Sequence, residues 1–258
     1  MSESTEPTQA TEATWEDVLP RMSDVDPDRL AMVTKRLRSA IAQKDLSPRR
    51  QALADLADAT RDLIDRLVAT DAPDDVILAA VADLRSAADR FAGYRCGTFY
   101  GFSEAANAGA TFEPVFDHSP MIGIANPLAP PITLEPHDDR VVGHAVFSHA
   151  YEGPPGCVHG GYVAAAFDEI LGAAQSLSGA PGMTGTLAIR YESPTPIAVP
   201  LRFEARLVGV ERRKIFVEGT CHVEDRLTAT AKGTFISLQA GKFLSMLEER
   251  AARKEGDA

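Results

Sequence analysis

The segment from residue 160 to residue 176, GGYVAAAFDEILGAAQS, constrains the fold most strongly because it has the composition of a buried helix. Small and apolar residues fill most positions, so the helix has apolar surface nearly all round instead of a single stripe. Other elements of the same domain must cover such a helix on several sides. Its charged residues are the adjacent pair Asp168-Glu169.

Strand-like alternation dominates the chain after this helix. Four segments carry β-branched or aromatic residues at every second position: GMTGTLAIRYES, PLRFEARLVGVE, RKIFVEGTCHVE and LTATAKGTFISL. The breaks at residues 211–213 and 224–226 are short enough for hairpins. Before the helix, RVVGHAVFSHAY alternates in the same way, and residues 111–116 are a candidate for a further strand. One antiparallel sheet wrapped around the helix satisfies this order.

The N-terminal part of the chain has a different texture. Residues 1–25 are polar and acidic, which predicts a disordered tail. Residues 26–92 show helical periodicity, with helices expected near 27–43, 48–69 and 74–91. The expected apolar stripe of the second helix comprises Leu53, Leu56, Ala57, Leu63, Ile64, Leu67 and Val68. We expect this helical extension to pack on the main domain, residues 93–240, or on a partner subunit, and residues 241–258 to form a C-terminal helix or tail.

The composition excludes several classes of protein. A formal net charge of −11 argues against a general nucleic-acid binder. No apolar run is long enough for a membrane span, and the N-terminus lacks a signal-peptide pattern. The three cysteines have no spacing for a disulfide framework or a zinc site, and His144 and His149 face opposite sides of a predicted strand. These features predict a cytoplasmic protein and argue against a zinc site built from the cysteines or a metal site built from these two histidines.

The sequence His159-Gly160-Gly161 leads directly into the buried helix. The first backbone N–H groups of a helix have no intrahelical partner, and the helix dipole adds positive potential there, as in an oxyanion hole. Asp168 follows Gly161 by two turns, about 10 Å along the axis, so one ester group cannot touch both residues of one helix. Two interpretations stay open: the acidic pair marks a solvated face, or a second subunit brings its Asp168 to this helix start across a two-fold axis.

The segment VHGGYVAAAFDEILGAA resembles the signature of the PaaI-like acyl-CoA thioesterases of the hot-dog superfamily. The blocks EGPPGCVHGG, MTGTLAIRYESPTPI and VERRKIFVEG are most similar to the branch of animal mitochondrial thioesterase-superfamily members. The resemblance covers about residues 120–240 and implies an α+β hot-dog fold. The all-α extension, residues 26–92, lies outside the region of resemblance. The resemblance also implies hydrolysis of acyl-CoA by water, without cofactor or metal, in a homodimer or in a homotetramer built as a dimer of dimers.

The same resemblance implies roles for individual residues. Asp168 would be the general base or nucleophile, Gly161 N–H would polarise the thioester carbonyl, and His159 would orient that carbonyl or assist the leaving group. Thr184 would help to position the attacking water. The candidates for contact with substrate or CoA are Gly160, Arg190, Arg212, Arg213, Lys214 and Asn126, the last of which serves either the substrate pocket or loop structure alone.

One departure from the family pattern concerns Gly153. Many bacterial relatives carry an Asn six residues before the histidine, where this chain has Gly153, but the branch with the GPPG sequence shares this absence, so it does not imply a loss of activity. The position of Glu169, about 100° around the helix from Asp168, favours a structural role for that second carboxylate. An alternative function is a non-catalytic acyl-CoA binding or sensor protein that uses its helical extension as a partner surface.

Overall fold

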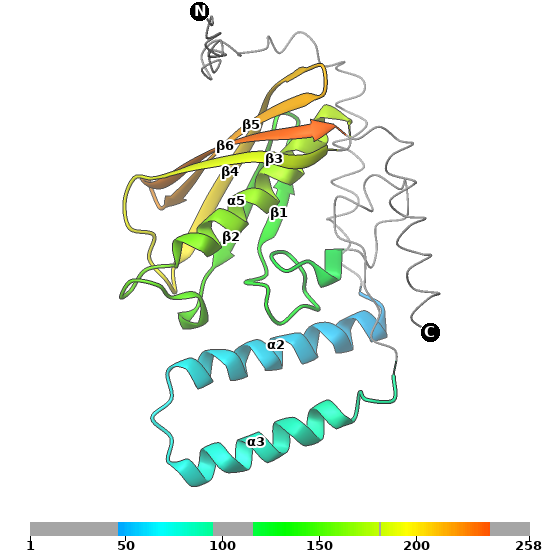
Figure 1. Ribbon diagram of the computed structural model, residues 1–258, viewed down its shortest axis with the longest axis vertical. Coiled ribbons are helices and arrows are strands. Elements are labelled where there is room, and N and C mark those ends of the chain that lie inside the picture. The colour runs from blue at the N-terminus through cyan, green and yellow to red at the C-terminus, as the bar shows by residue number, and fades with distance from the viewer. Residues whose placement is uncertain (1–45, 95–115, 181, 238–258) are drawn as a thin grey trace, which may run out of the picture.

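The computed structural model describes residues 46–94, 116–180 and 182–237 of the chain (Figure 1). The helices are α2 (Pro48–Val68), α3 (Asp74–Asp89) and α5 (Gly160–Gln175), with short 3-10 turns η2 (Phe116–His118), η3 (His149–Tyr151) and η4 (Ser176–Ser178). The strands are β1 (Thr133–Pro136), β2 (Arg140–Val146), β3 (Gly182–Tyr191), β4 (Pro200–Glu211), β5 (Lys214–Val223) and β6 (Arg226–Ser237). The helix expected at 27–43, both tails and most of the possible strand at 111–116 lie outside the described residues.

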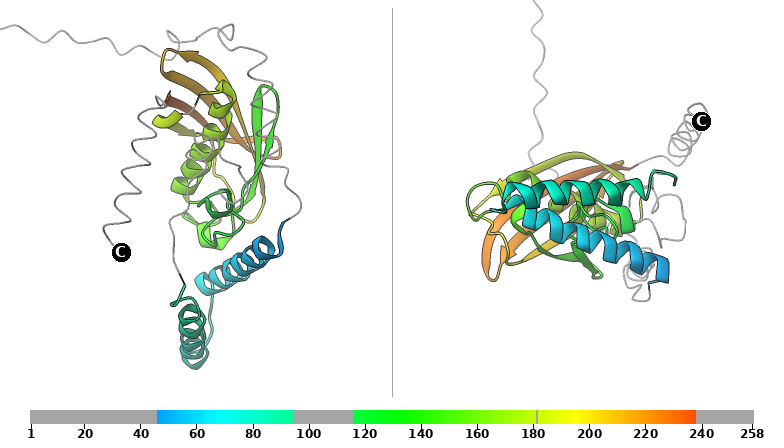
Figure 2. Two further views of the ribbon diagram at one scale, coloured as in Figure 1. Left: turned by 90° about the vertical axis from the view of Figure 1, so that its right-hand side faces the viewer. Right: turned by 90° about the horizontal axis from the view of Figure 1, so that it is seen from below.

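The described strands form one antiparallel sheet in the order β1-β2-β4-β5-β6-β3. The sheet curves around α5, which lies across its concave face (Figures 1 and 2). The residues that α5 buries are Val163, Ala166, Phe167, Ile170, Leu171, Ala173, Ala174 and Gln175. The predicted hot-dog fold, with a sheet wrapped around a long central helix, is therefore confirmed.

Strict alternation in the strands creates the inner face of the sheet. Along β4, Leu201, Phe203 and Ala205 are buried, whereas the intervening residues carry charges toward the outer face. Phe203 meets Phe167 of α5 edge-to-face, with 5.3 Å between ring centroids. Such aromatic pairs add stability beyond the area that they bury. The helix and the centre of the sheet therefore form one core.

The sequence did not predict β1 or the position of β3. Strand β1 has four residues, ends at Pro136 and follows two consecutive prolines, so its local signal is weak. Strand β3 directly follows α5 but pairs with β6, the last strand, at the far edge of the sheet. Most of its side chains are exposed. This edge is therefore a long strand with little cover in one chain.

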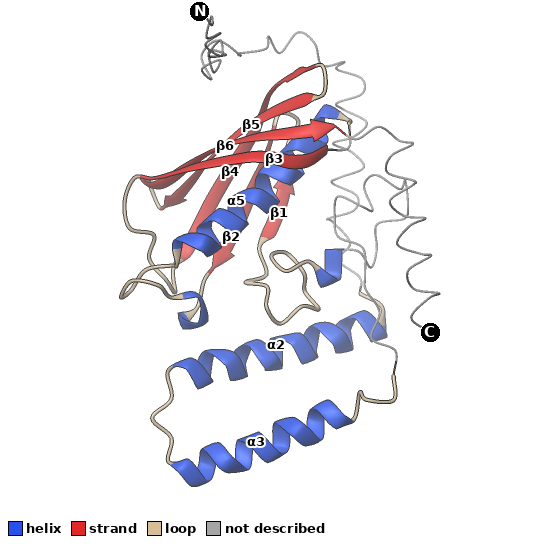
Figure 3. Cartoon of the chain, in the orientation of Figure 1, coloured by secondary structure: helices blue, strands red, loops and turns tan. Residues whose placement is uncertain are grey.

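The helical extension forms a separate layer beside the sheet domain (Figure 3). Helix α2 buries Ala54 and Ala57, but Leu56, Leu67 and Val68 of the expected stripe are exposed, so the stripe is partly wrong. Small side chains on the contact face let α2 approach the domain closely. Helix α3 has no buried residue.

Within the described ranges, no helix is long and apolar enough to cross a membrane. The cytoplasmic location expected from the sequence stays a prediction.

Candidate active site

His159 caps the first turn of α5. Its imidazole Nδ1 accepts a hydrogen bond of 3.0 Å from the backbone N–H of Gly161, and its carbonyl accepts from Tyr162 N–H at 2.9 Å. An accepting Nδ1 carries no proton, so the proton of the neutral ring resides on Nε2. The backbone N–H of Gly161, which the sequence predicts to be a free donor, therefore has an intramolecular partner. The Nε2–H of His159 is a second donor next to it.

The loop before His159 is held closed by Glu152. The Glu152 carboxylate accepts a 2.6 Å hydrogen bond from Gly156 N–H and lies 3.3 Å from His149 Nδ1. These two contacts lower the pKa of Glu152, the backbone hydrogen bond contributing most. Gly156, at φ +74°, takes the left-handed conformation that glycine adopts without strain. The sequence GPPG thus forms a fixed turn that returns the chain to His159.

Gly153 lies directly against His159. A Cβ added at Gly153 would lie 2.8 Å from His159 Cα, closer than real Cβ atoms approach such an atom. Any side chain at this position, Asn included, would require the backbone of residue 159 to shift. The departure from the family pattern at Gly153 is therefore a packing requirement of this loop.

Asp168 meets Thr184 on the exposed side of α5. Thr184 Oγ1 donates a 2.8 Å hydrogen bond to Asp168 Oδ1. Thr184 lies at the start of β3, where the pairing with β6 shifts register between Thr184 and Thr186. Both side chains are exposed. The hydrogen bond occupies one oxygen of the carboxylate, and the carboxylate can still accept a proton at the other.

Glu169, the neighbour of Asp168, points under the chain segment that precedes β1. Ser119 Oγ lies 3.4 Å from Glu169 Oε2. Burial raises the pKa of Glu169 to about 7, and the charge of Asp168 adds to this effect. The two carboxyl groups therefore differ in environment: Asp168 is exposed and hydrogen-bonded to Thr184, whereas Glu169 is largely withdrawn from water. This agrees with the structural role expected for Glu169.

The basic residues of the β4–β5 turn lie at the Thr184 end of the sheet. Lys214 is in register with Ile236 of β6, and Ile236 is in register with Met183 of β3. Two strand spacings, about 10 Å, therefore separate the backbone of Lys214 from the start of β3. Arg212 lies in the turn before Lys214 and has a positive φ of 52°. The guanidinium of Arg213 donates to the carbonyl of Ser237 at 3.2 Å.

Arg190 and Asn126 lie elsewhere. Arg190 is near the opposite end of β3 and forms an ion pair of 3.0 Å with Glu192. The amide of Asn126 is used within its own loop, where it donates to the carbonyl of His118 and accepts from Leu128 N–H. One chain brings neither residue to Asp168.

Three contacts of tyrosine side chains at the start of α5 were not expected from the sequence. Tyr191 donates a 2.8 Å hydrogen bond to the carbonyl of Gly160, which adjoins His159. Tyr162 stacks edge-to-face on Tyr151 and on His159, with centroid separations of 4.9 and 6.3 Å. No spacing rule connects a strand end or a 3-10 turn with a particular helix turn, so sequence reasoning had no signal for these partners. Among the described residues no group of three or more His, Cys, Asp and Glu side chains is arranged to hold a metal ion.

Comparison with known proteins identifies the central part of the chain. Residues 155–230 match the sequence profile of the thioesterase superfamily. A crystal structure of a thioesterase superfamily protein has 30% sequence identity and a TM-score of 0.64, and the alignment covers 71% of this chain and 94% of that one.

Two curated relatives are similar over a shorter segment. Human acyl-coenzyme A thioesterase THEM5 is 34% identical over 90 residues, which cover 34% of this chain and 36% of the relative. Acyl-coenzyme A thioesterase THEM4 of Xenopus laevis is 32% identical over 89 residues, with coverage of 34% and 40%. The similarity thus spans less than half the length of either relative.

The substitution Glu169→Gln tests the buried carboxyl group. Since the pKa of Glu169 is about 7 in the folded chain and near 4.5 when unfolded, its protonated form favours folding. That contribution is complete below about pH 4.5, is lost as the pH rises through 7, and amounts to up to about 3 kcal/mol. Urea unfolding between pH 5 and 8 should show a smaller loss of stability in the variant than in the wild type.

Asp225→Asn, in the exposed β5–β6 turn, is the control for this experiment. Identical pH dependence of the free energy of unfolding in the wild type and Glu169→Gln would contradict the burial of an ionisable group at this position.

Proposed function

The chain belongs to the thioesterase superfamily, and on that premise we propose that it hydrolyses acyl-CoA to the free acid and CoA. The observation that carries the proposal is the hydrogen bond between Thr184 and Asp168, which fixes a carboxylate on the exposed side of an otherwise apolar helix. The names of the relatives THEM5 and THEM4 support CoA thioesters as the substrate class.

In this proposal Asp168 is the general base for attack by water. Its carboxylate takes a proton from the water molecule while the water oxygen bonds to the thioester carbon. The C–S bond then breaks, and the CoA thiolate takes up a proton to leave as the free thiol. Thr184 holds one carboxylate oxygen, which leaves the second oxygen to contact the water. Direct attack by Asp168 on the carbonyl is the alternative within the same site.

The start of α5 is proposed to bind the thioester oxygen. The backbone N–H of Gly161 and the Nε2–H of His159 are both donors there, and the helix dipole favours the developing negative charge. Since the N–H of Gly161 already donates to Nδ1 of His159, the substrate oxygen has to share this N–H with Nδ1 or replace Nδ1 as its acceptor. The packing of Gly153 against His159 supports the imidazole as the group that serves where relatives use an Asn side chain.

A homodimer is proposed to complete the site. Gly161 and Asp168 are about 10 Å apart along one helix, so the two groups that one thioester needs are supplied by two chains. The long exposed edge of β3 supports antiparallel pairing with the same strand of a second copy. A two-fold axis at Leu187 would bring Arg190 of one chain opposite Thr184 of the other, near the basic β4–β5 turn. This cluster would hold the CoA phosphates.

Asp168→Asn tests the catalytic step. The amide keeps the size of the side chain but cannot accept a proton, so kcat should fall at least about a hundredfold. Release of CoA thiol from a panel of acyl-CoAs measures the effect, with Asp225→Asn as the control. Equal rates for Asp168→Asn and the wild type would disprove this mechanism, and tight acyl-CoA binding without thiol release by the wild type would favour the binding or sensor function.

Mixed dimers test whether the site is shared between chains. Asp168→Asn and His159→Ala homodimers each lack one half of every site, whereas a mixed dimer retains one intact site. Co-refolding the two inactive variants should therefore restore about a quarter of the wild-type activity. If each chain carried a complete site, no mixed dimer would contain an intact one and the mixture would stay inactive.

The double substitution Arg212→Gln/Lys214→Gln tests the phosphate contacts. Loss of two cations near the CoA phosphates should raise KM for acyl-CoA roughly tenfold. KM for an acyl-pantetheine, which lacks the nucleotide phosphates, should stay unchanged. Arg85→Gln/Arg90→Gln, in and directly after the exposed helix α3, makes the same change in net charge and serves as control. An equal increase of KM for both substrates would argue against phosphate binding by this turn.

A further inference from the structure

Helix α2 of the extension holds the loop of residues 117–131 through two arginines. Arg50 Nε and Nη2 donate to the two carboxylate oxygens of Asp117 at 2.8 and 3.0 Å. The Asp117 side chain is only 8% exposed, so this buried carboxylate has its counter-ion on α2. Three turns further along, Arg61 donates to the carbonyl oxygens of Asn126 and Ile124 at 2.7 and 3.1 Å. One helix thus fixes both ends of the same short segment.

The loop between these two attachments is internally hydrogen-bonded. Ala125 N–H donates to the carbonyl of Asp117 at 2.8 Å, and Ser119 Oγ accepts from the N–H groups of Met121 and Ile122 at 3.2 and 3.3 Å. Asp117 and Ser119, two residues apart in the chain, are thus both tied by hydrogen bonds to the residues that follow them in the loop.

One part of this loop contacts α5 beside Asp168. Ser119 Oγ reaches the carboxyl group of Glu169, whose neighbour in the chain is Asp168. Ser119 is buried and Glu169 is half-buried, so the loop meets α5 on the inner side of the helix turn that carries Asp168.

A second part of the loop contacts the start of α5 through two aromatic rings. Tyr151 donates its phenolic proton to the carbonyl of Leu128 at 3.1 Å, and its ring packs on Tyr162, which packs on His159. Burial raises the pKa of Tyr151 to about 12, so the hydroxyl remains protonated and keeps this donor role at neutral pH. The loop therefore contacts the surroundings of both Asp168 and His159.

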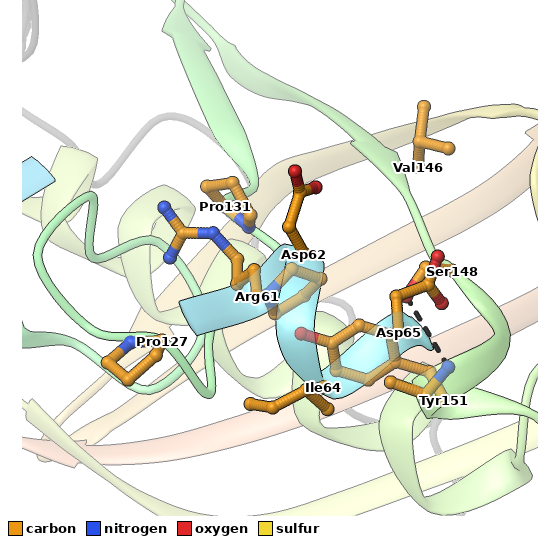
Figure 4. Close-up of a pocket in the computed structure, with 11 residues that line it drawn as sticks. Arg61, Asp62, Ile64, Asp65, Pro127, Pro131, Val146, Ser148 and Tyr151 are labelled. Atoms are coloured by element: carbon orange, nitrogen blue, oxygen red, sulfur yellow. Dashed lines mark hydrogen bonds between the residues drawn. The ribbon is translucent and has the colours of Figure 1, made fainter. Parts of the chain in front are cut away.

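The face of α2 that holds the loop is itself a poor site for an acyl chain. Arg61, Ile64 and Asp65 line a cavity against Pro131 and Tyr151 (Figure 4). Its volume of about 140 Å³ is below the range of small-molecule sites, which begins near about 300 Å³. The α2 face is thus suited to a structural contact.

We propose that Arg50 and Arg61 are positioning residues of the thioesterase site. By holding residues 117–131, they set the placement of Glu169 next to Asp168 and of Tyr162 next to His159. The inference rests on the proposed hydrolysis for its catalytic consequence. The helical extension would then belong to the catalytic part of the protein. Neither arginine would contact the substrate, but removal of either one would lower the turnover rate.

Arg50→Gln and Arg61→Gln test this inference against Arg49→Gln and Arg66→Gln. The control arginines are exposed on the same helix, and their substitution makes the same change in charge. Loss of either positioning residue should lower kcat about tenfold and change KM for acyl-CoA less than twofold, because the substrate phosphates bind elsewhere. Arg50→Lys, which keeps the charge but loses the two-pronged contact, should give an intermediate kcat.

Hydrogen exchange of the full chain supplies a readout that does not depend on turnover. In Arg50→Gln, exchange should accelerate at the amides of Met121 and Ile122 and in the first turn of α5, whereas Arg49→Gln should match the wild type. Faster exchange confined to α2, or equal kcat for Arg50→Gln and Arg49→Gln, would overturn the inference. Faster exchange in the first turn of α5 of Arg50→Gln, together with a wild type that releases no CoA, would support the positioning contact and reject the proposed hydrolysis.

Discussion

Burial of α5 is the constraint on which the rest of the structure depends. Because the helix is apolar nearly all round, the sheet has to curve about it, and the strands that face it alternate inner apolar with outer polar residues. What remains exposed is a narrow strip that carries Gly161 and Asp168. The same burial separates two adjacent carboxyl groups, since Asp168 lies on the strip and Glu169 lies under the segment before β1.

The helical extension complements this arrangement from outside the sheet. The face of α2 toward the sheet domain includes the buried Ala54 and Ala57, as well as Arg50 and Arg61, which donate to the loop of residues 117–131. Those arginines pair with the buried carboxylate of Asp117 and donate to the backbone carbonyls of Ile124 and Asn126, the second of which also accepts from Ala129 N–H. Polar contacts of this type specify one docking position, whereas an apolar stripe would tolerate sliding.

Sequence reasoning succeeded where local pattern and tertiary environment agree. The positions of α5 and of β4, β5 and β6 follow from periodicities that burial on the concave face reinforces, whereas β3 was predicted from its β-branched residues although most of its side chains are exposed. Sequence reasoning failed for β1, which has four residues next to prolines, and for part of the α2 stripe, where alanines displaced leucines from the contact. The contact of Ser119 with Glu169 joins residues 50 positions apart through an irregular loop, and no periodicity encodes it. The roles of the individual site residues remain predictions.

The close approach of Gly153 to His159 has an evolutionary consequence. A single substitution of Gly153 by Asn would bring its Cβ against the backbone of residue 159. The two positions are therefore epistatic: the path between the glycine and asparagine forms of this loop requires a prior shift at residue 159. A side chain at residue 153 is therefore accommodated only together with a change at residue 159.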